Sequence, residues 1–177
     1  MKKDQKMGVR CIIFLLIMAG TELNAQEYFR AQYEGVWQRH LNYSKAVAEA
    51  MPEENYDFKP TDEAMSFQGQ WLHVVDNISM LTARITGDRK EFYRKEDVTA
   101  FKKADVLDIL DRANAYVLDL IQNASDGLLN EEIEFGGVSM TKENIFYLLR
   151  DHQAHHRGQC LVYLRIKGIS APGYVGW

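Results

Sequence analysis

The segment TKENIFYLLRDHQAHHRGQCLVYLRIKG, residues 141–168, carries the clearest helical pattern in this chain of 177 residues. Thr141 is suited to cap its start, and Gly168 is a common helix terminator. Arg165 and Lys167 suit the negative end of the helix dipole. One face carries side chains spaced alternately by four and three residues, as in a bundle helix: Ile145, Leu149, His152, His156, Gln159 and Tyr163.

Three further segments show the same apolar period. The first runs from about Glu27 to Met51 and is stopped by Pro52. The second runs from Ser66, a favourable N-cap residue, to Gly87, and the third covers residues 104–123. The chain shows no internal repeat and no sign of a second domain, so we predict one all-α domain with four helices.

The links between these helices are long. Residues 52–65 and 88–103 are of a length that permits a crossover, so a strict up-down-up-down order is not required. The last link contains IEFGGVSM, residues 133–140, in which alternating apolar and polar residues flank Gly136 and Gly137. This pattern fits a small β-hairpin and, equally well, an irregular loop.

Residues 1–25 have the layout of a secretory signal peptide. Four basic residues precede the apolar run CIIFLLIMA (11–19), and Ala25 offers a cleavage point before Gln26. The run is shorter than the roughly 20 apolar residues that span a bilayer. We therefore expect export to the periplasm or the medium, without stable membrane insertion. An uncleaved membrane anchor is the alternative.

The mature chain, residues 26–177, is expected to be acidic. The leader removes four of the 21 Lys and Arg residues and two of the 25 Asp and Glu residues, which leaves 17 and 23 and a net charge near −6. Such a surface repels phosphate backbones, so nucleic acid is not an expected partner. Cys160 is the only cysteine left, so the core cannot contain a disulfide.

Three of the five histidines are found close together in the last helix. His152 and His156 are four residues apart and so differ by only about 40° around the helix axis. One ion could bind both imidazoles. On spacing alone, His155 could pair with His152 instead. Because two unpaired imidazoles on an inner face are costly to desolvate, we favour a metal site over two separate core histidines.

The third ligand is less clear from the residues themselves. His40 lies on the inner stripe of the first helix. On a helical wheel, His73 points away from the centre of the stripe formed by Trp71, Val75 and Ile78. The wheel therefore favours His40 as the third ligand, although a second contact face could bring His73 inward.

Three other residues of the last helix each have two interpretations. Arg157 could orient a substrate carboxylate or pair with Asp151 or Glu143. Gln159 could hydrogen-bond a ligand histidine or simply contribute to packing. Cys160 could be a reactive thiol, but a lone cysteine on a buried helix is more often a small hydrophobe.

The run HQAHHRGQ (152–159), followed by VYLRIKGI (162–169), resembles the C-terminal signature of DinB-type proteins. Upstream stretches agree with this resemblance, namely YDFKPT (56–61) and WLH (71–73). The resemblance covers essentially the whole mature chain, and the histidine-Arg-Gly-Gln element is its most specific part.

The resemblance implies an antiparallel four-helix bundle, often dimeric, with three histidine ligands to a divalent metal, usually zinc or nickel. Carried over by position, the ligands are His73, His152 and His156. His40 is then a core histidine or a pocket-lining group. Some proteins of this type are thiol-dependent transferases or isomerases.

Three neutral histidines leave at least one open coordination position on zinc and two or three on an octahedral metal. An open position is typical of a catalytic site. We therefore expect an exported metal-dependent enzyme of the thiol S-transferase or hydrolase type. The alternative is a non-catalytic exported metal-binding or interaction module. Export argues against thiol transfer, since small thiols are concentrated in the cytoplasm.

Overall fold

The computed structural model describes residues 29–175, so the predicted signal peptide lies outside the described residues. Within that range the first helix covers residues 29–50. The other long helices are α2 (Phe67–Thr86), α3 (Lys103–Asn123) and α5 (Lys142–Ile166). All four predicted helices are therefore confirmed. Shorter elements lie between them: η1 (Glu53–Asn55), η2 (Lys95–Ala100), α4 (Asp126–Asn130), β1 (Glu132–Phe135) and β2 (Val138–Thr141).

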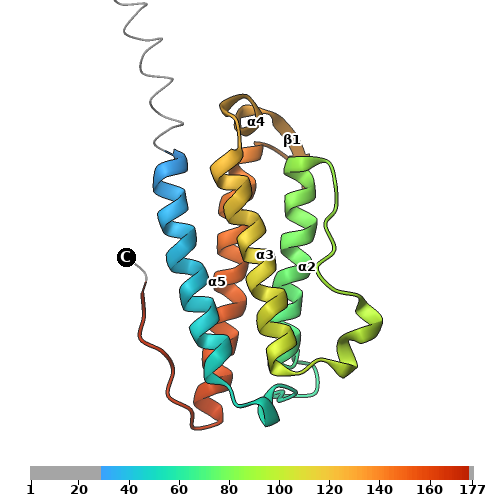
Figure 1. The fold of residues 1–177 in the computed structure, drawn as a ribbon, viewed down its shortest axis with the longest axis vertical. Helices are drawn as coiled ribbons and strands as arrows, with labels where there is room; N and C mark the ends of the chain where they lie inside the picture. The colour runs from blue at the N-terminus through green and yellow to red at the C-terminus, as the bar shows by residue number, and fades with distance from the viewer. Residues whose placement is uncertain (1–28, 176–177) are drawn as a thin grey trace, which may run out of the picture.

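The long helices form a bundle in which the first helix and α2 lie at opposite corners (Figure 1). Helix α2 packs against both α3 and α5. The first helix contacts the same two helices from the other side; Trp37 Nε1, for example, donates to the carbonyl of Asn114 on α3 at 3.2 Å. The predicted all-α four-helix bundle with long links is thus confirmed.

The long links determine the helix directions. Residues 87–102 return along the side of the bundle, so α2 and α3 run the same way (Figure 1). The antiparallel pairs are α2 with α5 and the first helix with α3, whereas the first helix and α5 run in parallel (Figure 1). No helix within residues 29–175 is long and apolar enough to cross a membrane.

Local chemistry explains most of the helix ends. Ser66 caps α2 by accepting a hydrogen bond from the Gly69 backbone N–H at 3.0 Å, and Gly87 ends this helix with φ of 86°. Thr141 does occupy the N-cap position of α5, but its side chain makes no capping bond. Its hydroxyl instead accepts a hydrogen bond from Asn144 Nδ2 at 3.0 Å.

The hairpin interpretation of residues 133–140 is correct. Strands β1 and β2 pair antiparallel with Phe135 opposite Val138, and Gly136 and Gly137 form the two-residue turn with φ of 62° and 78°. Positive φ at both positions is what a type I′ turn requires, and glycine adopts it without strain. Strand β2 leads directly into α5 and so fixes where that helix begins.

Candidate functional site

Helices α2 and α5 bring three histidines together at their interface. The ring centroids of His152 and His156 on α5 are 4.5 Å apart. His73 on α2 lies 5.1 Å from His152 and 4.7 Å from His156. One ring nitrogen from each residue lies within 4.8 Å of the other two. We call these three residues the histidine cluster.

The other two histidines are not part of the cluster. His40, which the helical wheel favoured, stacks on Trp37 with ring centroids 5.6 Å apart, between the first helix and α5. His155 is exposed. The wheel failed because α2 packs against two helices, α3 and α5. A residue such as His73, off the centre of the apolar stripe, therefore still faces a neighbour.

A chain of hydrogen bonds orients His156. The Tyr163 hydroxyl donates to the carbonyl of Met65 at 3.0 Å and accepts from Gln70 Nε2, also at 3.0 Å. The amide oxygen of Gln70 therefore faces His156 and accepts a hydrogen bond from Nδ1 at 2.6 Å. This bond keeps the ring proton on Nδ1 and leaves a lone pair on Nε2, as metal-binding histidines require.

The remaining geometry fits a divalent ion. His156 Nε2 lies 3.2 Å from His152 Nε2. Two nitrogens bound at about 2.0–2.1 Å to one tetrahedral zinc would be about 3.3 Å apart. His152 Nδ1 is buried and has no hydrogen-bond partner within residues 29–175. Three imidazoles, with two ring nitrogens already at ligand spacing, form a donor set suited to a divalent metal ion.

The protonation states also suit a metal. Burial first, and then the charges of the neighbouring histidines, lower the pKa of His152 and of His156 to about 4. Both rings are therefore neutral at pH 7, the state in which imidazole binds metal. His156 is buried, whereas His73 and His152 are half-buried. A small molecule could therefore approach from the side of His73 and His152.

Gln70 is the residue that hydrogen-bonds the histidine cluster, through His156, and it was not among the residues predicted from the sequence. Gln159, predicted either to bond a ligand histidine or to contribute to packing, is exposed. The signal that could have identified Gln70 is its position three residues before His73, on the same face of α2. Cys160 is buried, and burial raises the pKa of its thiol, as expected for a small hydrophobe rather than a reactive group.

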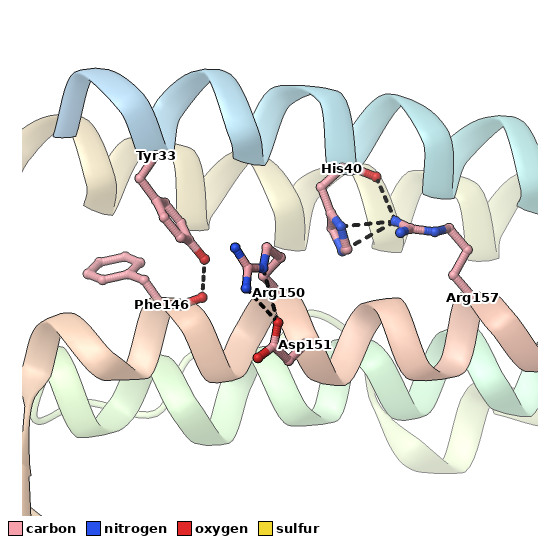
Figure 2. A network of polar contacts seen from close by, with 6 residues as sticks. All are labelled: Tyr33, His40, Phe146, Arg150, Asp151 and Arg157. Carbon is pink, nitrogen blue, oxygen red and sulfur yellow. Dashed lines mark hydrogen bonds and ion pairs between the residues drawn. The ribbon is translucent and has the colours of Figure 1, made fainter. Parts of the chain in front are cut away.

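Arg157 extends from α5 to the first helix (Figure 2), whereas the histidine cluster lies between α5 and α2. Its Nη1 donates to His40 Nδ1 at 3.0 Å, to the His40 carbonyl at 3.3 Å and to Ser44 Oγ at 3.2 Å. The ion pair considered with Asp151 does not form, because Asp151 pairs with Arg150 at 2.9 Å. Within residues 29–175, Arg157 forms no ion pair.

Comparisons with known proteins agree with this architecture. The model of the DinB family matches residues 24–175. The chain is 39% identical to Bacillus subtilis YrdA over 64 residues, which are 36% of this chain and 38% of YrdA. It is 23% identical to B. subtilis YjoA over 133 residues, which are 73% of this chain and 84% of YjoA.

Solved structures show the same fold at low sequence identity. The crystal structure of YjoA matches with a TM-score of 0.64 and 20% identity, over 81% of this chain and 96% of YjoA. B. subtilis YfiT matches with a TM-score of 0.63 and 17% identity, over 80% of this chain and 89% of YfiT. YfiT is described as a probable metal-dependent hydrolase with an unusual four-helix bundle topology.

The burial of His40 predicts a pH dependence of stability. Burial first, and then the charges of Arg157 and Arg150, lower the pKa of His40 to about 3. An unfolded histidine has a pKa of about 6.5, so the unfolded state takes up a proton first as the pH falls. The unfolding free energy contributed by neutral His40 is therefore present above pH 6.5 and is lost as the pH falls from about 6.5 toward about 3. The difference in unfolding free energy between wild type and His40→Gln should shrink by about 2 kcal/mol from pH 7.5 to pH 5.

Urea unfolding at the two pH values measures this difference. Gln68→Ala provides the control, because Gln68 is also buried but carries no titratable group, so its difference from wild type should be the same at both pH values. A pH-independent difference for His40→Gln would contradict the burial of a neutral ring.

Proposed function

This chain belongs to the DinB family, and from that premise we propose that it binds a divalent metal ion through His73, His152 and His156 and hydrolyses a small-molecule substrate. The observation that carries the proposal is the convergence of three ring nitrogens within 4.8 Å. When bound, a divalent ion polarises a carbonyl or phosphoryl group and lowers the pKa of a coordinated water. The chain's own residues hold the imidazoles neutral and aligned.

Two observations favour hydrolysis over thiol transfer. Residues 1–25 resemble a leader that would carry the protein out of the cytoplasm, where small thiols are concentrated, so a thiol co-substrate would be scarce. YfiT, described as a probable metal-dependent hydrolase, shares the fold. Zinc and nickel are the proposed metals, since both bind imidazole well. A homodimer and the absence of nucleic-acid binding remain predictions from the sequence.

Metal analysis of the purified protein tests this proposal. We expect about one zinc or nickel ion per chain. The variants His156→Ala and His73→Ala should lose the ion, and with it any hydrolysis of an activated ester such as p-nitrophenyl acetate. A chelator should have the same effect on the wild type. His155→Ala, which removes an exposed imidazole beside the cluster, should keep both properties.

The outcomes separate the alternatives. Protein without a stoichiometric ion, or His156→Ala with an undiminished ion content, would overturn the metal site. A bound ion without chelator-sensitive turnover would instead support the alternative, a non-catalytic metal-binding module.

The bond between Gln70 and His156 gives a second, independent test. Gln70→Ala leaves the Nδ1 proton of His156 without an acceptor. Loss of such an orienting partner typically costs 10–100-fold in metal affinity. We therefore expect the dissociation constant for Zn²⁺, measured by competition with a chromophoric chelator, to rise about tenfold or more.

Gln68 provides the matched control for this test. It is also buried on α2, but its amide donates to the carbonyl of Val98 at 3.1 Å and not to a histidine. Gln68→Ala should lower the free energy of unfolding by about 1 kcal/mol and leave zinc affinity unchanged. Equal zinc affinities for the two variants would contradict the orienting role of Gln70.

We also propose that the protein is exported. The basic start, the apolar run at residues 11–19 and Ala25 support this part of the proposal. Mass spectrometry of protein recovered from the periplasm or the medium should find a mature chain that begins at Gln26. An intact chain that begins at Met1, recovered only from the cytoplasm, would contradict export.

A further inference from the structure

Within residues 29–175, a hollow between the first helix and α5 is lined by three arginines and by no acidic side chain. Arg39 comes from the first helix, and Arg150 and Arg157 come from α5. The lining also includes His40 and Tyr43 of the first helix and Tyr174 and Val175 near the C-terminus. The chain as a whole has a net charge of −4, so this concentration of positive charge runs against its overall balance. A concave cationic surface attracts anions.

Arg157 is the most enclosed of the three cations. Burial lowers the pKa of its guanidinium, whose carbon lies 4.6 Å from the centre of the Tyr43 ring. All its hydrogen bonds within residues 29–175 use Nη1, which is held by His40 and Ser44. The edge formed by Nε and Nη2 therefore has no partner in that part of the chain. This edge can bind an oxyanion through two parallel hydrogen bonds.

The surroundings hold this guanidinium in place without neutralising it. His40 is neutral at pH 7, since its pKa is about 3, and its ring nitrogen accepts the bond from Arg157. Arg150 also extends toward the first helix, on the other side of His40 (Figure 2). Its positive charge adds to the lowering of the pKa of His40. Its partner Asp151 is 63% exposed, so solvent screens that ion pair.

We propose that the arginine pocket, formed by Arg39, Arg150 and Arg157, binds the carboxylate or phosphate group of a small molecule. The Nε and Nη2 edge of Arg157 makes the two-bond contact, and the other two arginines add charge. The pocket lies on the side of α5 that faces the first helix, whereas the histidine cluster lies on the side that faces α2. The inference therefore does not depend on the proposed metal site.

Calorimetric titration of the full-length protein with inorganic phosphate and with succinate tests the pocket. Arg157→Lys keeps the charge but loses the planar two-donor edge, so we expect it to weaken binding about tenfold or more. Arg39→Gln should also weaken binding, through the loss of one charge. Arg165→Gln is the control, because Arg165 is an exposed arginine on α5 outside the pocket. It should bind like the wild type.

The arginine Nε–H signals of ¹⁵N-labelled protein locate the bound anion. We expect the Arg157 signal, assigned through Arg157→Lys, to shift on titration; the tighter of the two probes identifies phosphate or carboxylate as the ligand group. An unshifted Arg157 signal overturns the proposal. The proposal is also overturned if neither Arg157→Lys nor Arg39→Gln weakens anion binding. That result would place the bound anion at the histidine cluster. Should Arg157→Lys fail to fold, Arg39→Gln, altered at an exposed side chain, gives the same comparison.

Discussion

Helix α5 packs against α2 on one side and against the first helix on the other, and each interface must satisfy the polar groups that it buries. On the α2 side, Gln70 accepts the Nδ1 proton of His156. On the other side, the ring of His40 accepts a hydrogen bond from Arg157. Each bond offsets a desolvation cost and also fixes the orientation of a functional group. Helix α5 thus presents the neutral imidazoles of His152 and His156 on one face and the guanidinium of Arg157 on another.

The sequence predicts the features that depend on short-range spacing. The helix ends at Pro52 and Gly87, and the Gly136–Gly137 turn, follow from local backbone chemistry. Helix geometry places His152 and His156 side by side, although spacing alone also allowed His155 as the partner of His152. The position of His73 does not follow from helix geometry. Each bundle helix packs against two neighbours, whereas a helical wheel shows only the average direction of the apolar side chains. The family pattern identified His73, and the fold places it beside the pair.

The side-chain partners outside one helix could not be predicted in this way. Gln70 and His156 are 86 residues apart, and His40 and Arg157 are 117 residues apart. Which glutamine meets His156, and whether Arg157 meets an acidic residue, depends on helix directions and on the rotation of each helix about its axis. Those quantities are set by the packing of the whole bundle, and the long links leave several arrangements open.

The placement of the first helix has a consequence for how the chain acquires its structure. Trp37 meets Asn114 across 77 residues, and Tyr33 donates to the Phe146 carbonyl across 113 residues. Topologies dominated by such distant contacts fold more slowly than bundles whose neighbours are joined by short loops. During synthesis, this helix leaves the ribosome long before either partner exists, and its aromatic face stays uncovered until α5 has been made. An uncovered apolar face of this kind is prone to aggregate until its partner helices are in place.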